Sequence, residues 1–176
     1  LLSQAEHGPD SQVVLVTPSE KLVQQVKDEL SKSLPLLSRS AVAEASLQNS
    51  MAFVVNSLDE GMDLLNEYAA EHLIINCQDA RKLAEKVKHA GSVFIGPYSP
   101  ESAGDYASGT NHTLPTRAYA RAYSGVSVES FLKSITFQEL TPQGLAGIGP
   151  AVMVMAEAEG LQAHANAIRV RLEKKP

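Results

Sequence analysis

Short apolar runs alternate with stretches of helical period through the first part of the chain. The apolar runs are rich in β-branched residues and have the length of buried strands; they lie at residues 13–16, 52–55, 73–75 and 92–95. The stretches of helical period lie at residues 18–33, 40–47, 58–68 and 79–89. This alternation predicts an α/β fold with a mainly parallel, Rossmann-like sheet and flanking helices, in which ligands collect at the carboxyl ends of the strands.

The first of these helices carries a start signal. Thr17, Pro18 and Glu20 stand in the order of a capping residue, a proline at the first helical position and a glutamate three residues after the cap. Apolar residues at helical spacing mark the expected inward-facing positions, which are Leu22, Val26 and Leu30 here and Met62 and Leu65 in the helix at residues 58–68.

The chain opens on a helix-like segment, residues 1–7, which Gly8 and Pro9 bring to an end. No initiator methionine precedes this segment, and we interpret it as the end of a longer helix. We therefore expect the chain to be the C-terminal part of a larger protein whose N-terminal portion is missing.

A long polar segment follows the last expected strand. Residues 96–124 show little helix or strand pattern, and a loop of that length is more often functional than merely connecting. Within it, residues 104–112 are punctuated by glycine and carry Asp105 and His112. We expect the functional site to lie near this loop.

The remainder of the chain has a helical pattern. The expected helices are residues 128–134, residues 142–159 after a Thr141–Pro142 start signal, and residues 161–174. Gly160 separates the last two, which predicts a bent arm that packs on another subunit. The expected organisation is therefore an α/β part at residues 1–126 and a helical, dimer-forming arm at residues 127–176.

Composition narrows the range of functions. With 176 residues, 44% hydrophobic and 20% charged, the chain has the make-up of an ordinary globular protein. A net charge of -5 without a basic stripe argues against a nucleic-acid partner and favours a small-molecule ligand. No apolar run approaches the roughly 20 residues of a membrane-spanning helix. The single cysteine, Cys77, forms no internal disulfide, which fits a reducing compartment.

Four of the five histidines lie beside a second candidate ligand or acid. The pairs are Gln4 with His7, Glu71 with His72, Asp105 with His112, and Glu159 with His164. The fifth, His89, lies among lysines and is expected to have no chemical role. Imidazoles, carboxylates and an amide together are able to build a zinc site with an open position.

Each pair also has a plain structural explanation. Gln4 and His7 are three residues apart and share one face of a helix, as ordinary polar surface residues do. Adjacent strand residues point to opposite faces, so Glu71 and His72 serve one pocket only if they lie in the turn before the strand. Spacing alone therefore indicates a metal enzyme of the α/β class, with its site near the long loop, and leaves these alternatives open.

Four longer blocks are more specific than any pair. They are residues 2–12 (LSQAEHGPDSQ), 70–75 (AEHLII), 90–96 (AGSVFIG) and 99–112 (SPESAGDYASGTNH). On these blocks the chain resembles the histidinol dehydrogenase family, and the resemblance covers essentially all 176 residues.

The resemblance implies a zinc-dependent oxidoreductase that takes L-histidinol through L-histidinaldehyde to L-histidine with two NAD, the last step of histidine biosynthesis. It implies Zn²⁺, one per subunit, and NAD as cofactors, and a homodimer with shared active sites. The cytoplasm is the expected location, or the plastid stroma if a transit peptide preceded the chain. The family's NAD-contacting residues match positions upstream of Leu1.

The family's site residues carry over onto single positions of this chain. The matching metal ligands are Gln4, His7 and Asp105 of one subunit and His164 of the other. The matching catalytic acid/base residues are Glu71 and His72, and His112 matches a supporting residue close to the site. The matching substrate contacts are Gln4, His7, His72, Asp105, Glu159 and His164.

The implied chemistry divides the work between two neighbours. His72 accepts the alcohol proton as hydride leaves, and Glu71 activates the water that hydrates the aldehyde. The rival interpretation is a non-catalytic metal- or ligand-binding homologue of the same fold. That interpretation predicts damage among the four ligand positions, and none of them is damaged.

Overall fold

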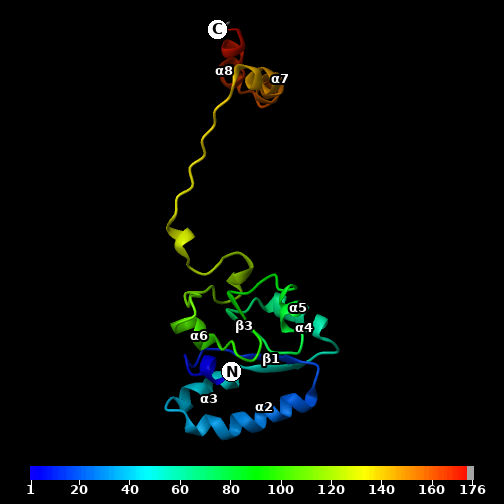
Figure 1. The fold of residues 1–176 in the computed structure, drawn as a ribbon, viewed down its shortest axis with the longest axis vertical. Coiled ribbons are helices and arrows are strands. Elements are labelled where there is room, and N and C mark those ends of the chain that lie inside the picture. The colour runs from blue at the N-terminus through cyan, green and yellow to red at the C-terminus, as the bar shows by residue number, and fades with distance from the viewer. Residues whose placement is uncertain (174–176) are drawn as a thin grey trace. The chain divides into compact units, whose positions relative to one another are not determined.

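The computed structural model describes residues 1–173, which divide into two compact units. The boundary lies between Phe131 and Leu132. All strands of the described residues belong to the first unit, and the second contains two helices (Figure 1).

Four short strands form two parallel pairs. Strand β1 (Val14–Thr17) pairs with β2 (Met51–Val54), and β3 (His72–Ile75) pairs with β4 (Ser92–Ile95). The expected α/β class and the parallel direction of the strands are confirmed. Within the described residues the strands form two separate two-stranded sheets instead of one continuous sheet.

Helices connect and flank the strands. Their bounds are α1 Leu2–Ala5, α2 Glu20–Ser33, α3 Ser40–Gln48, α4 Leu58–Tyr68, α5 Ala80–Ala84, α6 Glu101–Tyr106, α7 Pro142–Ala158 and α8 Gln162–Glu173. Three 3-10 turns, η1 Leu34–Leu36, η2 Tyr119–Arg121 and η3 Val128–Phe131, complete the regular structure of the described residues.

The largest departure from the sequence-based expectation is α6, which lies in the segment predicted to be irregular. Helix α5 ends at Ala84 instead of residue 89, and the helix expected at residues 128–134 is only the short turn η3. Residue 174, the expected end of the last helix, lies outside the described residues.

The start of α2 also differs from its prediction. Ser19, not Thr17, is the N-cap, and its hydroxyl oxygen accepts a hydrogen bond from the Leu22 N–H at 3.2 Å. The Thr17 hydroxyl oxygen accepts from the Ser19 N–H instead. Leu22 is largely exposed, so Val23 replaces it beside Val26 on the inward side of the helix.

Two small clusters form the core of the first unit. The larger joins the buried residues Met62, Leu73, Ile75 and Ala80, with Leu65 packed against them. The inward positions predicted for α4, Met62 and Leu65, are therefore confirmed. The smaller cluster joins Ala5, Val13 and Ala43.

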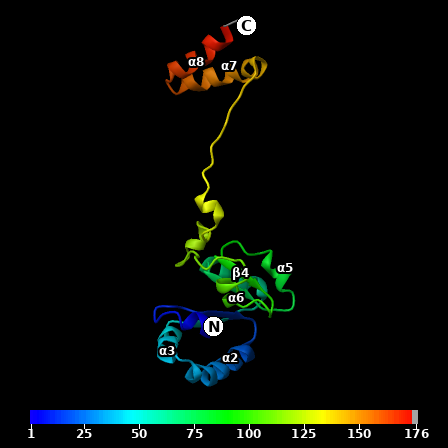
Figure 2. The same ribbon diagram turned by 60° about the vertical axis from the view of Figure 1, so that its left-hand side comes forward.

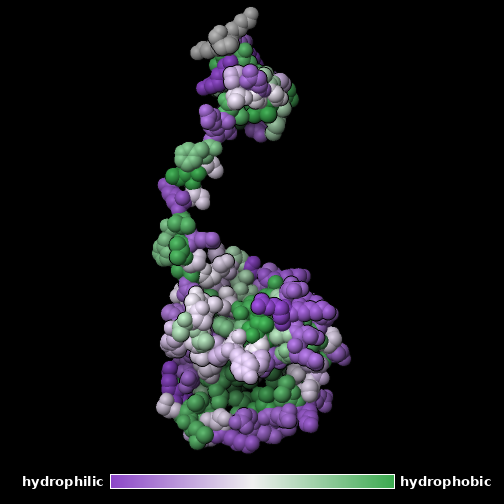
Figure 3. Space-filling model, viewed as in Figure 1, coloured by the Kyte–Doolittle hydropathy of each residue, from purple (hydrophilic) through white to green (hydrophobic). Residues whose placement is uncertain are grey.

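An apolar groove of about 200 Å³ runs between α2 and the β1–β2 pair. Val23, Val26 and Leu30 of α2 line one side, and Leu15 and Met51 of the strands line the other. Hydrophobic surface is visible at this groove in Figure 3. Helix α2 contributes no fully buried residue to the core as a result.

Helix α4 is the element that precedes β3 in the chain. Its N-cap is Ser57, whose hydroxyl oxygen accepts from the Glu60 N–H, and the Glu60 carboxylate accepts from the N–H of Asn56, the residue before the cap, at 2.7 Å. The hydrogen bond from the Asn56 backbone lowers the pKa of Glu60. At its other end Ala69 takes a left-handed conformation, with φ 53°, and turns the chain toward His72.

The second unit is a helical hairpin. Gly160, at φ 75°, ends α7 in a Schellman motif, with its own N–H bonded to the Glu157 carbonyl and the Leu161 N–H bonded to the Ala156 carbonyl. Helices α7 and α8 lie side by side instead of forming an open bend (Figure 2). An ion pair between Arg169 Nη2 and Glu157 Oε1, 2.8 Å apart, also joins the two helices.

No helix among residues 1–173 is long and apolar enough to cross a membrane. The longest, α7, has 17 residues and contains both Pro150 and several glycines.

Substitution of Leu73 tests how much the larger core cluster contributes to stability. Replacing Leu73 with alanine removes a side chain that is only 4% exposed and leaves a cavity, so the free energy of unfolding should fall by about 2–5 kcal/mol. The matched change Leu36→Ala, at a side chain that is 85% exposed, should alter it by only about 0.5 kcal/mol. Urea unfolding monitored by circular dichroism measures both, and equal losses would contradict the assigned core.

Candidate functional site

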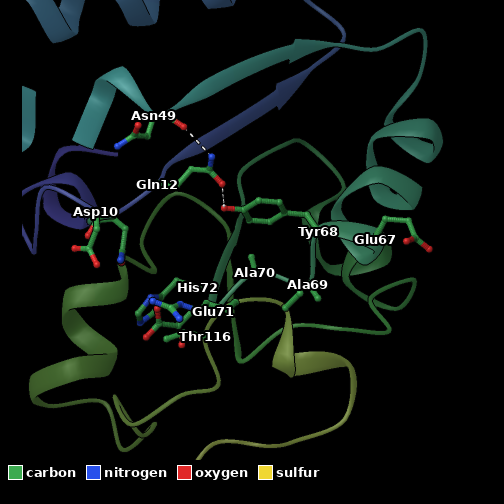
Figure 4. A pocket seen from close by; sticks show the side chains of 14 residues that line it. Asp10, Gln12, Asn49, Glu67, Tyr68, Ala69, Ala70, Glu71, His72 and Thr116 are labelled. Carbon is green, nitrogen blue, oxygen red and sulfur yellow. Dashed lines mark hydrogen bonds between the residues drawn. The ribbon is translucent and has the colours of Figure 1, made fainter. Parts of the chain in front are cut away.

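A cleft of about 740 Å³ opens in the first unit. Segments that are far apart in the sequence line it: the N-terminal helix and the loop after it, the end of α4, the start of β3, and the turn before η2 (Figure 4). The polar residues among them are Gln4, Asp10, Ser11, Gln12, Asn49, Glu67, Tyr68, Glu71, His72, Thr116 and Arg117.

Glu71 and His72 enter the cleft together. Only Glu71 lies before the strand, because His72 is the first residue of β3, yet both residues line the cleft. The Glu71 carbonyl accepts a hydrogen bond from the Ser92 N–H, and a Cβ at Gly91 would come within 2.6 Å of that carbonyl oxygen. The absence of a side chain at Gly91 therefore allows this turn to sit against the start of β4.

The His72 imidazole is buried and lacks polar partners. Its side chain is 9% exposed, and neither Nδ1 nor Nε2 makes a hydrogen bond within the described residues. The nearest charged group is the Asp105 carboxylate, with Oδ1 3.6 Å from Nε2, and that side chain is 15% exposed. The ring also stacks on Phe94, with centroids 5.8 Å apart and planes inclined by 30°.

Asp105 reaches His72 from α6, the helix that the sequence pattern did not predict. The site near the long loop was expected, but the helical geometry of residues 101–106 was missed. The pattern there is weak because glycine and polar residues interrupt it, and Glu101 and Gly104 are buried at its inner side.

Gln4 presents a second buried polar atom without a partner, its side-chain oxygen Oε1. It lies on α1 and lines the cleft, whereas His7 lies just beyond that helix, is exposed and is not among the lining residues. The His7 carbonyl oxygen accepts a hydrogen bond from Arg39 at 3.3 Å, which ties this segment to α3.

The remaining predicted residues lie apart from the cleft lining. His112 is exposed in the loop after α6. Glu159, at the end of α7, and His164, on α8, belong to the second unit and are exposed. Thus the first unit brings Gln4, Glu71, His72 and Asp105 together, His7 and His112 are not among the residues that line its cleft, and Glu159 and His164 belong to the other unit.

The side chains near the cleft offer few grouped donors for a metal ion. Among residues 1–173, no group of three or more His, Cys, Asp or Glu side chains is arranged to hold an ion. The buried, unsatisfied amide oxygen of Gln4, with the carboxylate of Asp105 beside His72, nevertheless offers the oxygen and nitrogen donors that suit zinc. The residues present therefore fit part of a zinc site.

Tyr68 and Gln12 form the opposite wall, which sequence reasoning missed. The Tyr68 hydroxyl donates to Gln12 Oε1 at 2.8 Å, and Gln12 Nε2 donates to the Asn49 carbonyl at 2.7 Å (Figure 4). Burial raises the pKa of Tyr68, so it remains a neutral donor. No local sequence pattern predicts these hydrogen bonds, because the residues that make them lie in three separate segments.

A tight turn closes another side of the cleft. Arg117 and Ala118 both have positive φ, 52° and 62°, and the Tyr119 N–H bonds back to the Thr116 carbonyl. This is the geometry of a type I′ turn, which glycine and asparagine normally occupy. Arg121, just after it, pairs with Glu67 of α4 at 2.8 Å and so holds the turn against the helix that leads into β3.

Comparison with known proteins gives a consistent result. Residues 1–172 match the family described as histidinol dehydrogenase. The chain is 58% identical over 174 residues to the histidinol dehydrogenase of Bacteroides fragilis (strain YCH46) and 52% identical over 174 residues to that of Vibrio vulnificus (strain YJ016). Each match covers 99% of this chain, but only 41% and 40% of the respective relative.

A solved structure agrees with these relatives. The crystal structure of histidinol dehydrogenase from Elizabethkingia anophelis superposes with a TM-score of 0.95 at 50% sequence identity, over 98% of this chain and 40% of that one. The chain thus spans about two fifths of the length of the proteins it matches. On the match over residues 1–172 and these identities, the chain belongs to the histidinol dehydrogenase family.

Proposed function

We propose that this chain forms the zinc- and substrate-binding part of an enzyme that oxidises L-histidinol through L-histidinaldehyde to L-histidine with two NAD. The observation that carries the proposal is the set of buried polar atoms in the cleft, Gln4 Oε1 and both His72 nitrogens, beside Asp105. Buried polar atoms without partners are rare in proteins because each costs desolvation free energy. A polar ligand that satisfies them accounts for their arrangement.

The zinc ligands would be Gln4, His7 and Asp105, completed by His164 of the partner subunit. When bound, the ion would hold the amino and imidazole nitrogens of the substrate and thereby orient the carbinol carbon. Gln4 contributes an uncharged amide oxygen, so this ligand set carries only one negative charge.

His72 and Glu71 perform the proton transfers in this proposal. His72 would accept the hydroxyl proton of histidinol in the first oxidation, for which NAD, when bound, would supply the hydride acceptor. Glu71 takes a proton from the water that adds to the aldehyde carbon, and His72 accepts the hydroxyl proton of the resulting hydrate in the second oxidation. Both side chains line the same cleft, which the division of labour requires.

The second unit would complete the site of a partner subunit. Helices α7 and α8 carry Glu159 and His164 on exposed positions, and large apolar side chains of α7 are exposed as well: Ile148, Val152, Val154 and Met155. Contiguous exposed apolar surface is typical of an interface, and a two-fold dimer covers the same surface twice.

The ligand assignment predicts metal loss. In the polypeptide at its full natural length, His7→Ala and Asp105→Ala should each lower the zinc content, because each removes one donor. His89→Ala, which removes a histidine outside the cleft, should leave the zinc content unchanged. Elemental analysis measures all three, and full zinc occupancy in both ligand variants would contradict the assignment.

The division of labour predicts unequal slowing of the two oxidations. Glu71→Gln should slow histidinaldehyde oxidation by about 10²–10⁴, the usual cost of losing a general base, and the first hydride transfer much less. Single-turnover absorbance of the reduced nicotinamide resolves the two steps when each substrate is supplied separately. Equal slowing of both steps would refute the separate role of Glu71, and His89→Gln serves as the unaffected control.

Sharing of the site between subunits predicts complementation. Full-length His7→Ala and His164→Ala proteins, each inactive alone, would form a mixed dimer with one doubly altered site and one intact site. Mixing under conditions of subunit exchange should therefore restore part of the activity. If mass spectrometry verifies exchange and no activity returns, His164 does not act across the interface.

A further inference from the structure

The orientation of His72 raises a physical question. A histidine that moves protons is usually held in one orientation by a hydrogen bond to its other ring nitrogen. Within residues 1–173, neither His72 nitrogen has a hydrogen-bond partner, and the Asp105 contact, at 3.6 Å, is longer than a hydrogen bond. No polar group of the described residues therefore holds the imidazole plane, and both nitrogens stay open to the polar ligand proposed above.

Phe94 provides the flat surface that the ring contacts. In the β3–β4 register His72 lies opposite Ser92 and Ile74 lies opposite Phe94, so His72 and Phe94 are diagonal neighbours on one face of the pair. Their rings are 5.8 Å apart between centroids and inclined by 30°, and Phe94 is only 7% exposed. Stacked aromatic pairs of this kind contribute specific orientation in addition to buried area.

Gly104 packs closely against the edge of the Phe94 ring. A Cβ at Gly104 would lie 2.7 Å from Phe94 Cε1 and 3.1 Å from Cζ, and 2.6 Å from the Thr110 hydroxyl oxygen, so the close approach of α6 to the ring requires a residue without a side chain. The next residue of α6 is Asp105, whose carboxylate faces His72 Nε2. Phe94 therefore packs against both the His72 ring and the backbone of α6 at Gly104.

We propose that Phe94, packed against Gly104, is the positioning residue for His72 and holds the plane of its imidazole. The flat ring fixes the imidazole plane, and the contact with Gly104 sets where Asp105 meets Nε2. Phe94 touches no reacting atom in this arrangement and acts only through His72 and α6. The kinetic part of this proposal rests on the oxidation of histidinol proposed above; the geometric part does not.

Phe94→Met tests the flat surface while keeping a large apolar side chain. In the full-length protein it should lower kcat by about 10–10², the range expected when a catalytic group is misplaced by about 1 Å, with little change in KM. Phe53→Met, the same change on β2 outside the cleft, should leave kcat at the wild-type value. Wild-type kcat in Phe94→Met would overturn the proposal.

A spectroscopic measurement decides the geometry without reference to activity. In protein with ¹³C-labelled histidine rings, the His72 signal, assigned by its loss in His72→Gln, should move in Phe94→Met as the ring current disappears. It should stay in place in Phe53→Met. An unmoved His72 signal in Phe94→Met would overturn the stacking role even if the protein proved inactive on histidinol.

Gly104→Ala reaches the same ring from the other side and serves if Phe94→Met does not fold. The added methyl group would overlap both the Phe94 ring and the Thr110 hydroxyl oxygen, so on this proposal the His72 signal should move and kcat should fall while KM changes little. Thermal unfolding followed by circular dichroism confirms that the variant is folded. A folded Gly104→Ala protein with wild-type kcat and an unmoved His72 signal would overturn the proposal.

Discussion

The parallel pairing of β3 with β4 is the constraint on which the site depends. It places His72 at the strand start beside the cleft and brings Phe94 beneath its ring, while the same strands bury Leu73 and Ile75 in the larger core cluster. The same backbone pairing therefore stabilises the first unit and fixes the position of His72. Alternation along β3 does this without conflict, since Leu73 and Ile75 face the core and His72 faces away from them.

The sequence predicted most elements of this framework because their physical signals are local. The bounds of α4 and β4 agree with their predicted ranges, and Thr141 caps α7 as its sequence indicates. Two local sequence signals led to wrong predictions. Thr17 precedes a proline as a capping residue does, yet it is the last residue of β1, and Ser19 takes the cap two residues later. Helix α6 was missed because its short sequence is rich in residues typical of loops.

The site was less accessible to the same reasoning. The family resemblance predicted several site residues that the fold brings close together: Gln4, Glu71, His72 and Asp105. The Tyr68–Gln12 wall and the support of His72 by Phe94 arise from contacts between segments distant in sequence, and no periodicity encodes such contacts. Glu159 and His164 lie in the other unit, so the fold of the first unit does not test their proposed roles.

The type I′ turn at the cleft edge has a mechanical consequence. Arg117 and Ala118 each occupy left-handed backbone conformations that cost about 1–2 kcal/mol for a residue with a Cβ. The ion pair of Arg121 with Glu67 opposes release of that strain by fastening the turn to α4. The two sides of the cleft are therefore held by different means: the strand side packs against the core, whereas the turn side combines a strained backbone with one solvent-exposed ion pair.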